Sequence, residues 1–342
     1  MTPALEVIEP GLMTNVQDFG RFGHQAQGMP TSGALDAGNL RLANALVHND
    51  QGQGALEIRV LGPTFRVAAE SVRVALTGTG TELEISGGLV DRVPSYRSVV
   101  LKQGQTFRVG RVADSAVCYL AVEGGFDLPE IYGSQSTYLS GKFGGFEGRV
   151  LQRGDLLPLK LDEASNKPIA LSPQPLFYDQ TAPIRVVPGP QDDYFSQEGL
   201  ALFFAPSYRV SAQANRMGVR LEGDPLTHSK GADINSDGIV TGSIQVPGNG
   251  LPIILLADHQ TTGGYPKIGT VASADLARLG RMSPGDVVRF RSVSVQEAEA
   301  AAMALEAQIA GLVESLVLLA DDAELFDYLL MNTPIIGGLF VE

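Results

Sequence analysis

The sequence predicts a mainly β protein made of two related lobes and a helical tail. The chain has 342 residues, with 40 glycines, 20 prolines and only 18% charged residues, a composition typical of short strands joined by tight turns. A weak internal repeat supports two similar lobes: YLAVEGG (119–125) and GRVLQRGDLLPL (148–159) resemble ILLADHQ (254–260) and GRMSPGDVVRF (280–290). Each half thus ends in a Gly-Arg pair, a Gly-Asp turn and a closing strand, which indicates a duplication.

The lobe boundary is predicted near Pro175. Residues 161–183 are rich in proline and polar side chains, which suits a linker between two β lobes. We therefore expect the first lobe and linker at 1–175, the second lobe at 176–294 and the tail at 295–342.

The tail is predicted to begin as an amphipathic helix, because leucine or isoleucine recurs at helical spacing at 305, 309, 312, 316 and 319. Residues 325–341 add a second apolar stretch. Left in water, this surface would cost about 25 cal/mol per Å², so it must be covered. Packing on the second lobe and packing on a partner are both open. The repeat suggests barrels that are complete without the tail, which favours a partner and a folded protein after truncation at Val295.

Composition also excludes several classes of function. A formal net charge of −13 repels nucleic acid and anionic lipid alike. The N-terminus has no basic region followed by an apolar core, and no uncharged apolar span of about 20 residues occurs. The single cysteine, Cys118, lies in an apolar run and is expected to be buried and free. We expect a cytoplasmic protein that binds neither nucleic acid nor membrane.

A metal site is not expected. The four histidines lack metal-binding spacing, and the adjacent Asp192 and Asp193 would face opposite sides of a strand.

The richest polar stretch is LLADHQTTGGYPKIG (255–269), which follows an apolar strand. We interpret Asp258 as a base or an orienting group, and Lys267 as a stabiliser of developing negative charge. Both residues are expected to lie on a loop rather than in a core. An Asp258–Lys267 salt bridge that only closes this loop is the alternative. Neighbouring side chains could read an amide or ureido group, and the glycines would let backbone N–H groups approach a ligand. The catalytic candidates are Asp258, Lys267 and Tyr265, and the substrate-binding candidates here are Gln260, Thr261, Thr262, Gly263 and Gly264.

Further substrate-binding candidates lie in other polar loops. Arg216 could recognise a carboxylate or amide with its planar fork of donors, or could brace its loop. Asp18 and Arg21 could face a ligand or form an ion pair with each other. Asp36 is expected to cap a helix that begins at Ala37. The complete set of these additional substrate-binding candidates is Asn215, Arg216, Gln245, Asp18, Arg21 and Ser32.

Seven sequence blocks, among them 11–36, 133–149, 215–223 and 257–267, occur in one order along the chain. Together they resemble the family historically called allophanate hydrolase subunit 2. The resemblance implies that each lobe is a cyclophilin-like β-barrel and that the active region lies between the lobes. One departure is His259, where the family pattern has arginine, so anion binding at this position is not expected. The blocks are GLMTNVQDFGRFGHQAQGMPTSGALD (11–36), RLAN (41–44), GSQSTYLSGKFGGFEGR (133–149), VPGPQDDYF (187–195), NRMGVRLEG (215–223), GSIQVP (242–247) and ADHQTTGGYPK (257–267).

The resemblance implies one component of a larger enzyme. The first interpretation is the C subunit of an ATP-dependent 5-oxoprolinase, which opens the lactam of 5-oxoproline to glutamate in a hetero-oligomer with a kinase-inhibitor-like B-type subunit and a third, lactam-utilisation subunit. An alternative is a biotin-dependent carboxyltransferase acting on urea or a related amide, with carboxybiotin on a separate carrier. Another is a non-catalytic regulator that binds a kinase-inhibitor protein. The seven blocks are shared by all three.

We predict that the chain alone binds neither ATP nor another cofactor tightly. In GSQSTYLSGKFGG, Ser136 stands where a phosphate loop needs glycine, and Phe143 follows Lys142 where serine or threonine is needed. ATP is therefore expected to enter the site only with the partner subunits. Titration calorimetry of the purified chain checks this, and tight, stoichiometric nucleotide uptake would contradict it.

Overall fold

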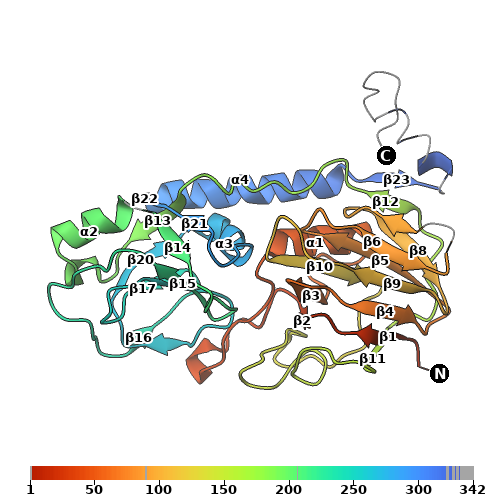
Figure 1. The fold of residues 1–342 in the computed structure, drawn as a ribbon, viewed down its shortest axis with the longest axis horizontal. Helices are drawn as coiled ribbons and strands as arrows, with labels where there is room; N and C mark the ends of the chain where they lie inside the picture. Colours follow the sequence, from red (N-terminus) through yellow and green to blue (C-terminus); the bar gives the residue numbers. More distant parts are fainter. Residues whose placement is uncertain are drawn as a thin grey trace.

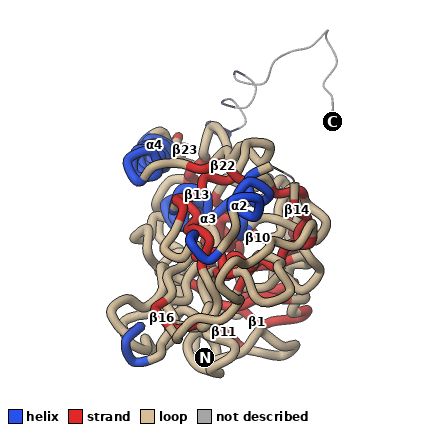
Figure 2. Tube along the Cα trace, turned by 90° about the vertical axis from the view of Figure 1, so that its left-hand side faces the viewer, coloured by secondary structure: helices blue, strands red, loops and turns tan. Residues whose placement is uncertain are grey.

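The computed structural model describes residues 2–88, 91–205 and 207–320, together with 323–325, 328 and 331. It shows two β lobes side by side, with one long helix lying along both (Figure 1). Turned by 90°, the molecule shows its helices α2, α3 and α4 toward one side and the β1 and β16 strands toward the other (Figure 2). The predicted fold class, mainly β with a C-terminal helix, is confirmed.

The first lobe consists of two antiparallel sheets around one apolar core. The strand orders are β11-β1-β4-β9-β6-β7 and β2-β3-β10-β5-β8. Phe65 and Phe107 meet in this core with ring centroids 5.4 Å apart. The strands are β1 (Ala4–Glu9), β2 (Met13–Gln17), β3 (Ala55–Arg59), β4 (Thr64–Val67), β5 (Ser71–Thr77), β6 (Leu83–Ser86), β7 (Arg92–Val93), β8 (Ser98–Lys102), β9 (Thr106–Val109), β10 (Val117–Val122) and β11 (Leu156–Pro158).

Helix α1 (Ala37–Leu46) packs on the β3, β5 and β10 strands. Strand β10 is buried at every position, because one of its faces lines the barrel core and the other lies under α1. Asp36 caps α1 as predicted, its side chain accepting a hydrogen bond from the Asn39 amide at 3.0 Å. Cys118 on β10 is buried and free, also as predicted.

The second lobe is built on one sheet in the order β21-β14-β15-β18-β17-β20-β13-β22, with a small β16–β19 pair beside it. Its core includes Phe203 and Phe290, whose rings stack with centroids 4.6 Å apart. Asp192 and Asp193 lie in a short 3-10 turn rather than in a strand. The elements are β13 (Ile184–Pro188), α2 (Gln197–Phe204), β14 (Tyr208–Val210), β15 (Gly218–Glu222), β16 (Asp237–Gly238), β17 (Ser243–Gln245), β18 (Ile253–Leu255), β19 (Thr262–Gly263), β20 (Lys267–Val271), α3 (Ser273–Gly280), β21 (Val287–Val288) and β22 (Phe290–Ser292).

The tail begins with helix α4 (Val295–Glu314), which starts at a capping box of Ser294 and Glu297. Helix α4 contacts α3 and β13 of the second lobe and α1 of the first. The prediction that the helical spacing continues through Leu316 and Leu319 is wrong, because α4 ends at Glu314. Strand β23 (Val317–Leu319) follows and pairs with β12 (Ile169–Leu171) of the linker. No helix in the described part of the chain is both long and apolar enough to cross a bilayer.

The expectation that a partner covers the apolar face of the tail is wrong for the described part of the tail. Ile309 and Leu312 are buried in the same cluster as Leu40 of α1 and Leu176 of the linker. The repeat suggested complete barrels, but it did not reveal the apolar groove that α1 and the linker form outside them. Truncation is therefore expected to expose this groove and destabilise the protein. Most of the second apolar stretch, 325–341, lies outside the described residues.

We predict that Ile309→Ala lowers the free energy of unfolding by about 2–5 kcal/mol, because it leaves a cavity under α4. The matched control is Met303→Ala on the same helix, where the side chain is 72% exposed. Denaturant unfolding of both variants measures the difference. Equal stabilities would show that α4 does not belong to the folded core.

Candidate functional site

The first lobe inserts a short segment, 30–36, against the second lobe. The Ser32 amide donates to the Ala257 carbonyl at 2.9 Å, and Leu35 belongs to the second lobe's apolar core. Gly33 has a φ of +89°, and a Cβ there would come within 2.7 Å of the Phe19 carbonyl oxygen. This close approach requires glycine. The sequence-predicted residues Ser32 and Asp258 are thereby brought to one interface.

Arg216 of the second lobe is the centre of this interface. Its Nε and Nη2 donate to the two oxygens of Asp258 at 2.8 and 3.1 Å. Its Nη1 donates to the carboxylate of Glu57 in the first lobe, and Nη2 also donates to the Gly33 carbonyl at 2.7 Å. Burial alone would lower the pKa of Arg216, but the carboxylates of Glu57 and Asp258 raise it above its ordinary value. The guanidinium is therefore a charged bridge between the lobes.

This geometry assigns Arg216 the bracing role. A guanidinium has five N–H donors, and the four hydrogen bonds of Arg216 all end on protein groups. Its side chain is 4% exposed. The neighbouring Asn215 is exposed and accepts a hydrogen bond from the Met217 amide at 2.8 Å, which closes the turn. Recognition of substrate by this pair stays a prediction.

Asp18 and Arg21 are held by the 131–137 loop and not by each other. Asp18 accepts hydrogen bonds from Ser134 Oγ at 2.7 Å, from Ser136 Oγ at 2.5 Å and from the Gln135 amide at 2.6 Å. Arg21 Nη2 donates to the Ser136 carbonyl. No Asp18–Arg21 ion pair occurs among the described residues, so the internal-pair alternative is not what the structure shows.

Arg21 and Ser32 each bury a polar atom without a partner. Arg21 Nη1 and Ser32 Oγ are both inaccessible to solvent and make no hydrogen bond. Burial lowers the pKa of Arg21, and the nearby Asp18 and Asp258 carboxylates partly offset this. Ser32 also has a φ of +53°, in the left-handed region that non-glycine residues rarely adopt. These are features common at functional sites.

A second polar cluster lies within the second lobe. Gln245 on β17 faces Lys267 on β20, and both side chains are buried. Lys267 Nζ donates to Asp237 Oδ2 at 2.9 Å. Gln245 Nε2 has no partner, and a Cβ on Gly263 would lie only 2.4 Å from it. Gly263 therefore leaves room for this amide.

The structure corrects two expectations about the central motif. Asp258 and Lys267 are not joined by a salt bridge, because Asp258 pairs with Arg216 and Lys267 with Asp237. Neither stands on an exposed loop: each is 3% exposed, and Lys267 is the first residue of β20. Residues 260–265 between them are more accessible, and Tyr265 is 41% exposed. The more accessible residues of this run are Gln260, Thr261, Thr262, Gly263, Gly264 and Tyr265.

His259 fixes the loop rather than facing a ligand. Its side chain is fully buried, with Nδ1 2.6 Å from the Gln260 carbonyl oxygen and Nε2 3.2 Å from Thr241 Oγ1. A carbonyl can only accept, so Nδ1 carries the proton and Nε2 accepts from the threonine. Burial lowers the pKa of His259 despite the Gln260 carbonyl and Asp258, which raise it. The imidazole is neutral at physiological pH.

Glu57 was missed by the sequence reasoning. It lies in ALEIR (55–59), where a charged residue between apolar neighbours indicates the solvent side of a strand. The structure buries it completely under the Arg216 bridge. No group of three or more His, Cys, Asp or Glu side chains suited to a metal occurs among the described residues.

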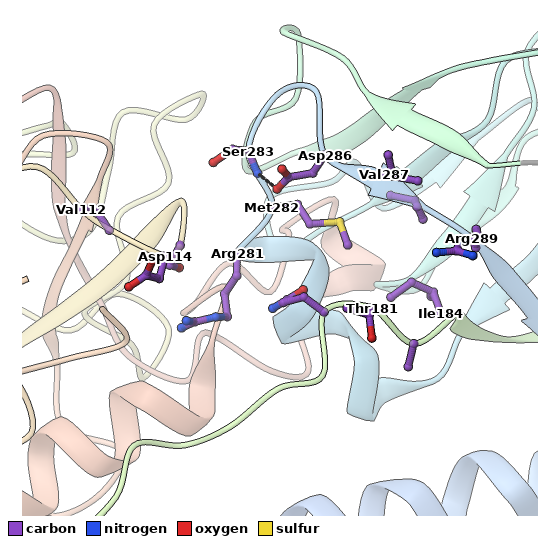
Figure 3. Close-up of a pocket in the computed structure, with 14 residues that line it drawn as sticks. Val112, Asp114, Thr181, Ile184, Arg281, Met282, Ser283, Asp286, Val287 and Arg289 are labelled. Carbon is purple, nitrogen blue, oxygen red and sulfur yellow. Dashed lines mark hydrogen bonds between the residues drawn. The ribbon is translucent and has the colours of Figure 1, made fainter. Parts of the chain in front are cut away.

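A cavity of about 560 Å³ lies at another part of the lobe junction, between residues 112–115, 180–184 and 281–289 (Figure 3). Asp114, Arg281, Asp286 and Arg289 line its wall. None of the sequence-predicted site residues lines it. The candidate site therefore stays with the Arg216 bridge and the Lys267 cluster.

The chain resembles a known family of protein domains. The profile of the carboxyltransferase domain, subdomains A and B, matches residues 27–292. The chain belongs to this family. The resemblance seen in the sequence is thereby confirmed.

Relatives within the family differ in size. The chain is 37% identical to the 5-oxoprolinase C subunit of Escherichia coli and 34% identical to that of Haemophilus influenzae, covering 86% of this chain and 93% of each relative. It is 34% identical to urea amidolyase of Saccharomyces cerevisiae over 86% of this chain, but over only 17% of that protein.

Solved structures of the family agree with the fold. The crystal structure of the Kluyveromyces lactis urea carboxylase matches with a TM-score of 0.80 and 31% identity, over 95% of this chain and 30% of that one. The K. lactis urea amidolyase matches with a TM-score of 0.80 and 30% identity, over 91% of this chain and 20% of that one. The chain thus spans less than a third of either solved protein.

We predict that His259 makes the protein less stable in acid. Burial holds its folded pKa below the ordinary value of 6.5, so the unfolded chain takes up a proton that the folded protein resists. Stability is therefore lost as pH falls from about 6.5 toward the lower folded pKa. His259→Gln should show a smaller loss between about pH 7.5 and pH 5.5 in urea unfolding, whereas His24→Gln on an outer loop should behave as wild type. An unchanged pH dependence in His259→Gln would show that this imidazole is not the group responsible.

Proposed function

We propose that this chain is the C subunit of an ATP-dependent 5-oxoprolinase that opens 5-oxoproline to glutamate. One observation carries the proposal: the matches to two bacterial 5-oxoprolinase C subunits cover 93% of those proteins, whereas the match to yeast urea amidolyase covers 17% of it. In this proposal the enzyme is a cytoplasmic hetero-oligomer. Its other members are a kinase-inhibitor-like B-type subunit and a third, lactam-utilisation subunit.

Opening of the lactam requires an oriented water molecule and stabilisation of the negative charge that develops on the carbonyl oxygen. The site can supply both. A water oxygen bonds to the lactam carbonyl carbon, the ring C–N bond breaks, and the nitrogen leaves with a proton. Asp258 can orient water or a substrate N–H, because each carboxylate oxygen keeps a lone pair beyond the one used by Arg216. Lys267 and the backbone N–H groups near Gly263 can stabilise negative charge on the carbonyl oxygen.

Asp258 and Lys267 lie at opposite ends of the 258–267 run, each with its own partner. The more accessible Gln260, Thr262 and Tyr265 stand between them along the chain. In this proposal these side chains read the amide of the substrate. Arg21 and Ser32, with unpartnered polar atoms, belong to the first-lobe wall of the same site.

ATP is assigned to the assembled complex and not to this chain, because the glycine-rich 133–149 block lacks phosphate-loop spacing. The chain itself supplies polar groups around the lactam. Phosphorylation of the lactam carbonyl oxygen by ATP would make the carbonyl carbon a better target for water, and the phosphoryl group would leave afterwards as inorganic phosphate. This is the chemical reason to couple the step to ATP.

A second candidate function is carboxyl transfer to urea or a related amide. It is favoured by the family's description as a carboxyltransferase domain and by the likeness to K. lactis urea carboxylase. The carboxyl group would then arrive as carboxybiotin on a separate carrier, and the same polar groups would hold the ureido ring. A non-catalytic regulator, the third interpretation, predicts no turnover with any partner set.

Reconstitution with the products of adjacent genes, followed by an assay of ATP-dependent glutamate release, tests the proposal. We predict that Asp258→Asn and Lys267→Ala each lower turnover by about 100-fold, because each removes a positioned charge. Asp258→Asn should also lower the melting temperature, since Arg216 loses its bidentate partner.

The matched control is Asp193→Asn, which breaks an exposed Asp–Lys pair in the same lobe. It should leave turnover unchanged. If the wild-type complex releases no glutamate, the function is wrong. If it does and both site variants turn over within a few-fold of wild type, the site assignment is wrong.

A further inference from the structure

Glu57 is a buried carboxylate whose position is fixed from three directions. It lies on β3, opposite Tyr119 on β10, and its side chain is fully buried. One oxygen accepts hydrogen bonds from the Tyr119 hydroxyl at 2.7 Å and from the Leu35 amide at 2.9 Å. The other accepts from Arg216 Nη1. Apart from a 180° flip, which only exchanges the two equivalent oxygens, rotation of the carboxylate would break at least one of these contacts.

Two of the three contacts of Glu57, from Tyr119 and from the Leu35 amide, belong to the first lobe. Tyr119 is itself held, because its hydroxyl accepts a hydrogen bond from the Asp36 amide at 2.8 Å. Burial, with the adjacent Glu57 and Asp36 carboxylates, raises the pKa of Tyr119 well above its ordinary value, so the phenol keeps its proton and donates it. The first lobe therefore presents an oriented carboxylate to the second lobe.

Arg216 transmits that orientation to Asp258. The guanidinium is planar and rigid, so fixing Nη1 on Glu57 and Nη2 on Gly33 also fixes the edge that carries Nε. That edge holds both oxygens of Asp258. A rotation of the guanidinium would turn the Asp258 carboxylate with it.

We propose that Glu57 is a positioning residue for Asp258, acting across the lobe interface through Arg216. The inference rests on the proposed function only for the reaction used in its activity test. It adds a residue from the first lobe to a site whose central motif lies wholly in the second. Glu57 touches no substrate and serves by fixing the direction in which Asp258 presents its free lone pairs.

The chain contains a matched control for this proposal. Asp36 of the first lobe pairs with Arg281 of the second at 3.0 Å, and its carboxylate is also fully buried. It accepts further hydrogen bonds from the Asn39 amide and the Tyr178 hydroxyl. Asp36 and Glu57 are thus both buried inter-lobe carboxylates, but only the side chain of Glu57 is linked through Arg216 to Asp258.

The activity test compares Glu57→Gln with Asp36→Asn in the reconstituted complex. Glu57→Gln is expected to lower kcat by about 10- to 100-fold with KM within a few-fold of wild type, because a displaced catalytic group loses rate rather than binding. Asp36→Asn should lower the melting temperature to a similar degree and keep kcat within a few-fold. Equal losses of kcat in the two variants would overturn the proposal.

A double-mutant cycle separates positioning from general loosening of the interface. In the Asp258→Asn background, Glu57→Gln should lower the residual kcat by no more than about twofold, because its effect passes through Asp258. An undiminished effect in that background would overturn the proposal. If Glu57→Gln fails to fold, Tyr119→Phe takes its place, because it removes one hydrogen bond to Glu57 without changing a charge. It should lower kcat, but by less than is expected for Glu57→Gln. A wild-type kcat in Tyr119→Phe would then count against the proposal.

An activity-independent readout keeps this test distinct from that of the proposed function. The Nε–H resonance of Arg216, assigned by its loss in Arg216→Lys, reports the geometry of the Asp258 contact in the chain alone. Glu57→Gln should shift or broaden it, and Asp36→Asn should leave it in place. If the wild-type complex releases no glutamate but the resonance moves as expected, only the proposed function fails. If the resonance does not move in Glu57→Gln, the positioning role fails.

Discussion

The Arg216 guanidinium is the contact on which the candidate site depends, because it holds Asp258 of its own lobe and Glu57 of the other at once. Buried ion pairs contribute little net stability, since desolvation offsets much of the attraction. Their geometric demands are strict, however, and a lysine could not serve two carboxylates and a carbonyl in one plane. The bridge therefore acts chiefly to define one relative placement of the two lobes.

Other contacts between the lobes also fix their relative placement. Leu35 enters the second lobe's core, and Gly280 leaves the space for it, since a Cβ there would lie 2.8 Å from Leu35 Cβ. Helix α4 then spans both lobes on one side, with an ion pair between Arg41 and Glu306 (Figure 1). Apolar packing stabilises the docked lobes, while the arginine–carboxylate contacts define how the lobes are placed relative to each other. The site is consequently a property of the docked pair of lobes.

Local sequence patterns predicted the structural features that depend on residues close together in the chain. The turn-rich composition predicted the β class, apolar spacing predicted α4 as far as Glu314, and the position of Asp36 before an apolar run predicted its cap. Patterns could not show which distant groups meet. Glu57 alternates with apolar residues as an exposed strand residue would, and only the packing of the 30–36 segment and Arg216 over that face buries it. The partners of Asp258 and Lys267, and the surface under α4, were missed for the same reason.

Charge balance at the interface gives a reason for the neutral His259. The carboxylates of Asp18, Glu57 and Asp258 lie among the guanidiniums of Arg21, Arg59 and Arg216, and the pKa values of Arg21 and Arg59 are lowered by burial. A further cation next to Asp258 would compete with Arg216 for its oxygens. The buried imidazole cannot do so, because it is neutral and both its nitrogens are used by Gln260 and Thr241. Within the described residues, the orientation of Asp258 therefore follows Arg216, and through it the first lobe.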